Sequence, residues 1–225
     1  MLENLNPTNQ IDKDRIAYIR RRNLLVFLAM FNGVIIFTLL FTYSKDLILA
    51  LAGGVIFGYV IYKLFNSKIF EAKLKLEKIR IQKEILNEFL EKENIKFSPN
   101  NGIKEEKFKR FFNYNDILEF HSLNNFEFED LSIYDIFLKR QNDIFVGVLI
   151  ISQKGFIKDK SDEKNIFMKK KNKKYFEIKD HFVSDKACLI ASLCNPFFVN
   201  LYKNKEENIR TFKQNLRLIK NLVIE

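Results

Sequence analysis

The chain has 225 residues, of which 47% are hydrophobic and 29% are charged, a balance that excludes an intrinsically disordered tail. Lysine and arginine outnumber the acidic residues by 38 to 28, which gives a formal net charge of +10 and favours an anionic partner, either phospholipid or nucleic acid. There are only two cysteines and no CxxC pair, so a disulfide framework is not indicated.

Residues 24–43 form the first strongly apolar segment, and none of them is charged. A helix of about twenty residues, rising ~1.5 Å per residue, covers the ~30 Å hydrocarbon core of a bilayer. A second apolar run, residues 47–65, follows the short turn 44–46 and is interrupted only by Lys63. The ammonium of a lysine so near the helix end can reach the membrane interface. The two runs therefore predict a transmembrane hairpin over residues 24–65.

Two other interpretations of the apolar runs are less favoured. A secretory signal would have a shorter charged leader, a shorter apolar run and a small-x-small cleavage site. Runs of this length are also more typical of membrane spans than of core helices in a soluble protein. The positive-inside rule places the basic leader, residues 1–23, and the chain after the second span in the cytosol. The flanking basic residues are Arg15, Arg20, Arg21, Arg22, Lys63, Lys68, Lys73 and Lys75.

Small residues recur at helical spacing in both spans. Such patterns let helix backbones approach closely in lipid. We expect them to pack the hairpin against itself, and a homo-oligomer interface is the alternative. The residues are Ala29, Gly33, Ala50, Gly54 and Gly58.

Residues 66–97 are predicted to form a juxtamembrane helix, because apolar residues recur every three or four positions without glycine or proline. We interpret this helix as a stalk. A dimeric coiled coil is the alternative, but the segment is short and Lys83 interrupts the apolar stripe. The sequence Ser98-Pro-Asn-Asn-Gly102 then predicts a linker, so residues 98–225 are assigned to a cytosolic α+β domain.

This domain is expected to hold a mostly antiparallel sheet with flanking helices. Residues 104–112 and 115–120 are read as short helices, and residues 126–137 as a strand with a bulge near Asp130. The β-branched run 144–151 predicts a central strand. Further strands are expected at 155–158, 165–170 and 174–178. The fold class is therefore a membrane-anchored α+β protein.

Helices are expected to return after Asp185. Residues 187–194 are read as a helix with buried thiols, and Asn195-Pro196 as the start of a helix over 197–202. Asn204 with Glu207 has the form of a helix cap. It precedes a stripe that predicts a closing helix over one sheet face, formed by Ile209, Phe212, Leu216, Ile219 and Val223.

No catalytic or cofactor motif emerges from the chain. One histidine, His181, with Cys188 and Cys194 does not supply the four closely paired ligands of a structural zinc site. A cysteine nucleophile has no local signature, and there is no P-loop, GxGxxG or HExxH motif. We therefore expect no cofactor and no metal.

Two basic clusters are candidate contacts for a membrane surface or another anionic partner. Each lysine near anionic headgroups contributes ~1 kcal/mol, although a solvated loop is an equally weighted interpretation of the second cluster. Nucleic acid is not expected, because no nucleic-acid-binding motif is present. The first cluster is Arg20, Arg21 and Arg22, and the second is Lys169, Lys170, Lys171, Lys173 and Lys174.

Two stretches carry a resemblance to a known family. One is Asp143-Ile-Phe-Val-Gly147-Val-Leu149, and the other runs from Ser184-Asp185 through Phe197-Phe198-Val199-Asn200-Leu201. They are similar to the Phe-x-Gly strand and the late helical region of the bacterial domain of unknown function 3137 family. The resemblance implies two N-terminal spans, a charged helix and a cytosolic α+β domain, and it brings no activity.

The sequence thus favours a non-enzymatic protein of the bacterial inner membrane, with both termini cytosolic. The cytosolic domain is expected to bind a protein partner or the membrane surface. An enzyme acting on lipid or nucleotide is the first alternative, with a site that gathers His181, Cys188 and acidic residues in the fold. A small transport-complex subunit ranks last, because the spans contain almost no ionisable residue.

Overall fold

A computed structural model describes residues 10–66, 68–157, 176, 178 and 181–223. The chain divides into two compact units. The hairpin unit comprises Met1–Ile85 with Asn200–Lys205, and the sheet unit comprises Leu86–Val199 with Glu206–Glu225.

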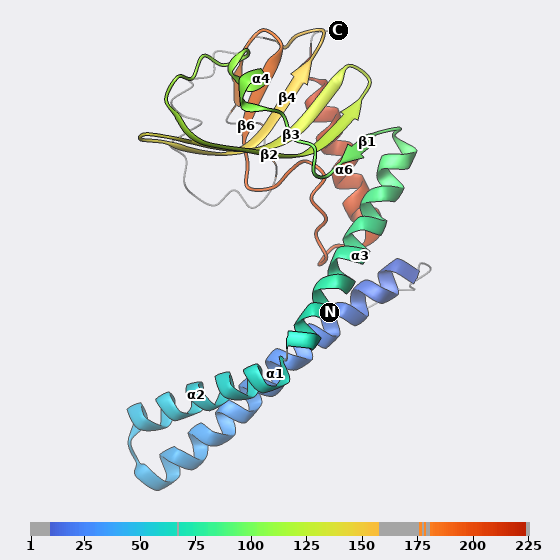
Figure 1. Cartoon of the computed structure of the whole chain (residues 1–225). Helices are drawn as coiled ribbons and strands as arrows, with labels where there is room; N and C mark the ends of the chain where they lie inside the picture. Colours follow the sequence, from blue (N-terminus) through green and yellow to red (C-terminus); the bar gives the residue numbers. More distant parts are fainter. Residues whose placement is uncertain (1–9, 67, 158–175, 177, 179–180, 224–225) are drawn as a thin grey trace. The chain divides into compact units, whose positions relative to one another are not determined.

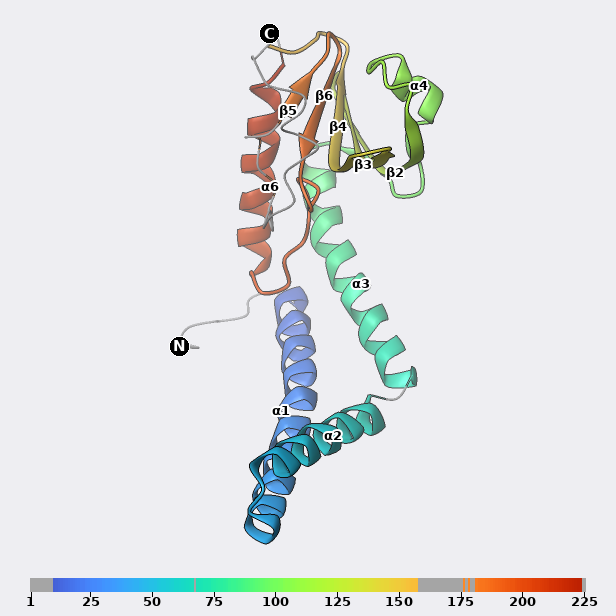
Figure 2. The same ribbon diagram turned by 90° about the vertical axis from the view of Figure 1, so that its left-hand side faces the viewer.

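The hairpin unit is built on two helices, α1 (Gln10–Ser44) and α2 (Leu47–Phe65), which lie side by side in both views (Figures 1 and 2). Lys45 in the turn has a φ of 52°. The Asp46 side chain then caps α2 by accepting hydrogen bonds from the backbone N–H groups of Ile48 (2.9 Å) and Leu49 (3.1 Å). The predicted pair of apolar helices is confirmed, and α1 begins well before residue 24.

The charged helix α3 (Lys68–Lys92) is also confirmed. Its first turns belong to the hairpin unit, and its last turns, from Leu86, belong to the sheet unit. The predicted linker 98–102 does not separate the units, because it lies entirely within the sheet unit. Ser98 there ends the edge strand β1 (Lys96–Ser98).

The described strands of the sheet unit form one antiparallel sheet in the order β1-β2-β3-β4-β6-β5. The predicted central strand is confirmed as β4, which lies between β3 and β6. The remaining strands are β2 (Ile117–Phe128), β3 (Leu131–Arg140), β4 (Ile144–Ser152), β5 (His181–Val183) and β6 (Ala187–Ala191).

Three expectations for this region were wrong. Residues 115–120 do not form a helix, because most of them begin β2. The predicted bulge near Asp130 is instead the hairpin turn between β2 and β3. The irregularities of β2 lie elsewhere, at Leu118 and at Asn124–Asn125. Finally, residues 187–194 are not helical. Their core is β6, which is buried along its whole length between β4 and β5.

The predictions for the later helices are confirmed only in part. Residues 197–202 do not form a helix, although Asn195 Oδ1 accepts a hydrogen bond from the Phe197 N–H at 2.9 Å, as a cap would. The predicted closing helix is α6 (Lys205–Lys220), which begins directly after Asn204. The helix expected at 104–112 is shorter, α4 (Glu105–Lys109).

Most of the smaller predicted strands lie outside the described residues. The strand at 165–170, and all of 174–178 except residues 176 and 178, lie outside the described residues. Of 155–158, Phe156 forms a single bridge to Val223.

Both faces of the sheet are packed. In Figure 2, α4 lies on one side of the strands and α6 on the other. The first face buries a cluster around Tyr134, Ile136 and Leu138 against the segment that holds α4. The second face buries rings from four separate segments against one another, with ring centroids 4.9–6.1 Å apart. These rings belong to Phe89, Phe126, Phe197 and Phe212.

Candidate functional site

The hairpin helices expose most of their apolar surface. Only 17% and 11% of the most apolar stretches of α1 and α2 are buried, and within the described residues these two helices are long and apolar enough to cross a membrane. A core helix of a soluble protein would be largely buried. Several apolar side chains are more than half exposed, including Phe27, Met30, Val34, Ile48, Val55 and Leu64.

The small residues of the two spans lie at the contact between α1 and α2. A Cβ added at Gly33 would be 2.8 Å from the Gly54 carbonyl oxygen. A Cβ added at Gly58 would be 3.1 Å from the Ala29 carbonyl oxygen. Ala29 and Gly33 of α1 and Ala50 and Gly54 of α2 are buried. These small residues therefore serve the contact between the two helices of the hairpin itself.

The first basic cluster lies on α1, where Arg20, Arg21 and Arg22 are exposed. Two of these residues contact other parts of the hairpin unit. The Arg21 guanidinium pairs with Glu77 at 3.1 Å, and Arg22 donates to the Tyr202 hydroxyl at 3.3 Å. The second cluster, Lys169, Lys170, Lys171, Lys173 and Lys174, lies outside the described residues.

Arg15, which the sequence indicates only as one of the basic residues flanking the first span, is buried and holds the loop Asn200–Lys205 within the hairpin unit. Arg15 donates to Asp12 Oδ1 at 2.9 Å and to the Leu201 carbonyl oxygen at 2.9 Å. The same Asp12 oxygen accepts the Lys205 N–H at 3.1 Å. A buried guanidinium needs such acceptors to offset its desolvation, so Arg15 ties the first turns of α1 to this loop.

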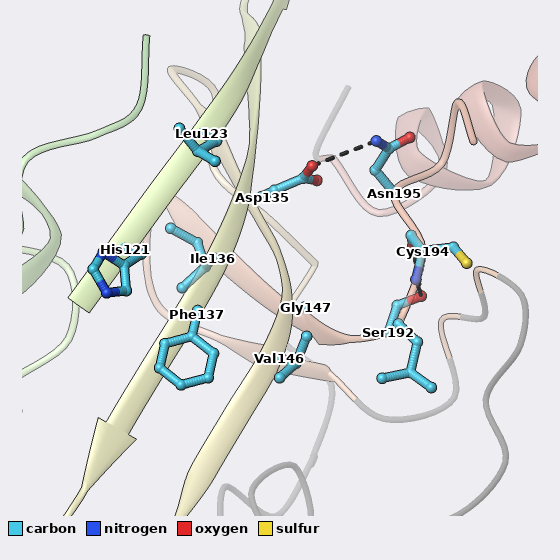
Figure 3. A pocket seen from close by; sticks show the side chains of 11 residues that line it. His121, Leu123, Asp135, Ile136, Phe137, Val146, Gly147, Ser192, Cys194 and Asn195 are labelled. Atoms are coloured by element: carbon cyan, nitrogen blue, oxygen red, sulfur yellow. Dashed lines mark hydrogen bonds between the residues drawn. The ribbon is translucent and has the colours of Figure 1, made fainter. Parts of the chain in front are cut away.

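The sheet unit contains a small cavity of about 240 Å³ on the second face of the sheet. β2, β3 and β4 supply one wall, and the segment directly after β6 supplies the other (Figure 3). Gly147 allows this geometry, because a Cβ there would lie 2.1 Å from the Ile190 carbonyl oxygen of β6. The lining side chains are mainly apolar and include Leu123, Phe137, Val146 and Leu193.

Asp135 of β3 is the acidic group of the cavity. Its Oδ2 accepts hydrogen bonds from Asn124 Nδ2 at 2.6 Å and, more weakly, from Asn195 Nδ2 at 3.4 Å. Burial raises the pKa of this carboxyl above its ordinary range, and the two amide hydrogen bonds oppose that shift. Asn124 reaches it because the irregularity of β2 turns this residue to a φ of 55°.

The cysteines and histidines are dispersed rather than gathered. Cys188 is buried in β6, and burial raises the pKa of its thiol to about 12. His181 is buried in β5, where its Nδ1 lies 2.8 Å from the Ile178 carbonyl oxygen. Neither lines the cavity, which instead contains Cys194 and His121. Within the part of the chain that the structure describes, no group of three or more His, Cys, Asp or Glu side chains could hold a metal ion.

Cys194 is poorly suited to act as a nucleophile. Burial and, to a smaller extent, the negative charge of Asp135 raise the pKa of its thiol. A thiol with a raised pKa carries little thiolate at neutral pH. In Figure 3 its sulfur is turned away from Asp135. The arrangement therefore suits binding better than covalent chemistry.

Comparison of the chain with protein-family models, with curated proteins and with solved structures finds no match.

Proposed function

We propose that this protein is a membrane-anchored binding module, in which the α1–α2 hairpin spans the bilayer and the sheet unit binds a protein partner in the cytosol. The observation that carries the anchor in this proposal is the exposure of the two apolar helices. Exposed apolar surface of this extent is unfavourable in water and favourable in lipid. The bacterial inner membrane is part of this proposal, in keeping with what the sequence resemblance implies.

The orientation that we propose rests on the basic residues at the open end of the hairpin. Arg20, Arg21 and Arg22 precede the apolar part of α1, and Lys63 lies in the last turn of α2. The closed end carries one lysine and one aspartate, Lys45 and Asp46. We therefore propose that both termini are cytosolic and that Arg20–Arg22 contact anionic headgroups.

A binding role is preferred to an enzymatic one. The cavity combines a carboxylate with a thiol whose pKa is raised, and such a thiol is a weak nucleophile. An enzyme acting on lipid or nucleotide was expected to gather His181 and Cys188 with acidic residues, but neither residue lines the described cavities. A homo-oligomer through the small residues is also less favoured, because the hairpin occupies them itself.

Membrane fractionation tests the anchor. The full-length chain, expressed in bacteria, is expected to sediment with membranes, to resist extraction at alkaline pH and to be released by detergent. A dual-activity reporter inserted at Ser44 should report the outer side of the membrane, and one fused after Glu225 should report the cytosol. Recovery of the intact chain in the aqueous fraction without detergent would falsify the proposal.

Photo-crosslinking in intact membranes tests the partner. A photoreactive amino acid at the exposed Leu193 or Ile144 of the sheet unit should give a discrete heavier species. The same amino acid at the exposed Leu64 of α2 is the matched control and should react mainly with lipid. If both positions of the sheet unit gave only the uncrosslinked chain, the protein-binding role would be rejected, while the anchor would stand.

A further inference from the structure

The two oxygens of the Asp135 carboxylate have different surroundings. Both amide hydrogen bonds, from Asn124 and Asn195, go to Oδ2. Among the described residues, Oδ1 accepts no hydrogen bond, and no lysine, arginine or histidine forms an ion pair with Asp135. One oxygen of a half-buried carboxylate thus remains available at the wall of the cavity.

A half-buried carboxylate without a positive partner is costly, because desolvation penalises its charged form. The raised pKa of Asp135 expresses the same cost. A cation that entered the cavity would offset this cost with a charge-assisted hydrogen bond, which is about twice as strong as a neutral one. The carboxylate therefore specifies the charge of a ligand.

The walls of the cavity specify the remainder of the ligand. Leu123, Phe137 and Val146 form an apolar surface beside the carboxylate (Figure 3). Val146 is 40% exposed and Leu123 53% exposed, so this apolar surface is open to an incoming molecule. A calcium ion does not fit, because it takes about six to eight oxygen ligands and Asp135 is the only carboxylate among the described lining residues.

The volume limits the size of the ligand. A cavity of about 240 Å³ is smaller than the ~300–1,000 Å³ of sites for drug-sized molecules. It corresponds to roughly eight waters at ~30 Å³ each. The occupant is therefore a small molecule of about ten non-hydrogen atoms.

We propose that this cavity binds a small primary amine, whose ammonium donates to Asp135 Oδ1 and whose apolar chain packs on Phe137 and Val146. The Asn124 and Asn195 amides hold Oδ2, so that Oδ1 is directed at the ligand. This inference goes beyond the anchored-module role, and it does not depend on membrane insertion, because every lining residue belongs to the sheet unit.

Calorimetric titration of the full-length chain in detergent micelles tests the proposal, with phenethylamine as the probe and 2-phenylethanol as its neutral counterpart. Saturable binding of the amine is expected, with the alcohol at least tenfold weaker. Asp135→Asn should weaken amine binding at least tenfold, which corresponds to about 1.4 kcal/mol. The matched control is Glu106→Gln, which neutralises an exposed acid of α4 outside the lining set and should change the affinity less than twofold.

A second variant keeps the test decisive if Asp135→Asn fails to fold. Val146→Phe fills the cavity from a partly exposed position and leaves the carboxylate in place. It should abolish binding of phenethylamine while the far-UV circular dichroism spectrum, which reports the folded secondary structure, stays unchanged. The proposal is overturned if the wild-type chain shows no saturable binding, or if the alcohol binds as tightly as the amine. Equal binding by a folded Asp135→Asn or Val146→Phe chain would also overturn it.

Discussion

Gly33 and Gly54 face each other across the hairpin so closely that a Cβ on either residue would lie 2.8 Å from the carbonyl oxygen of the other. Real Cβ atoms do not approach a backbone oxygen at this distance, so α1 and α2 can pack this way only if both positions lack a side chain. The backbone contact therefore depends on two glycines that are 21 positions apart in the sequence (54 − 33 = 21).

Gly54→Ala is expected to destabilise the hairpin by about 1–3 kcal/mol, the usual cost of overpacking. The added methyl group would press on the Gly33 carbonyl and on Phe37 Cβ at 2.9 Å. The adjacent Gly53→Ala is the control, because its methyl group would meet only the flexible Leu40 side chain and both variants gain the same helix propensity. Thermal loss of helicity in detergent measures the difference. Equal melting of the two variants would contradict the close contact.

Phe197 and Phe198 are neighbours with opposite surroundings, since 2% of Phe197 and 49% of Phe198 is exposed. Phe197 packs on Phe89, Phe126 and Phe212. Phe197→Ala should lower the free energy of unfolding of the sheet unit by about 3–5 kcal/mol, and Phe198→Ala by no more than ~0.5 kcal/mol. Because the chain contains no tryptophan, urea unfolding would be followed by tyrosine fluorescence. A similar loss of unfolding free energy in both variants would contradict the burial of Phe197 in the core.

The two cysteines should differ in reactivity toward a thiol reagent at about pH 8. Cys188 is fully buried, and burial raises the pKa of its thiol to about 12. Cys194 is only half-buried, although its pKa is also raised. We expect the native Cys194→Ser chain to react at least ~100-fold more slowly than the native Cys188→Ser chain, and the two to react alike once unfolded. Fast labelling of native Cys188 would show that β6 is not buried.

Asp135 should make the stability of the sheet unit depend on pH. Burial raises the pKa of its carboxyl above the ordinary 3.8, so the folded state holds this proton more tightly than the unfolded state does. The resulting stabilisation is fully present below pH 3.8 and is lost as the pH rises through the folded pKa. Asp135→Asn removes this dependence. The melting temperature of the variant minus that of the wild type should therefore become more positive between about pH 4 and pH 7. If this difference in melting temperature stayed constant over the range, the result would contradict the burial of the Asp135 carboxylate.

The elements that could be predicted from local pattern are those whose signal is long or strongly periodic. The apolar helices, α3, β4 and α6 are of this kind, and the turn at Lys45–Asp46 follows from its position between two apolar runs. β6 was mistaken for a helix because all five of its residues are buried, so neither a period of two nor one of 3.6 marks it. The start of β2 was missed because its irregularity at Leu118 breaks the alternation of apolar and polar residues.

The apolar hairpin, the charged helix α3 and the antiparallel character of the sheet could therefore be predicted, since each depends on residues close together in the chain. The cavity and the contacts of Arg15 depend instead on how distant segments pack. Asp135 meets Asn124 through the pairing of β2 with β3, and it meets Asn195 through the segment after β6. Arg15 meets Leu201. The Asp135–Asn195 and Arg15–Leu201 contacts join residues far apart in the sequence, and no local pattern encodes which distant segments a fold brings together.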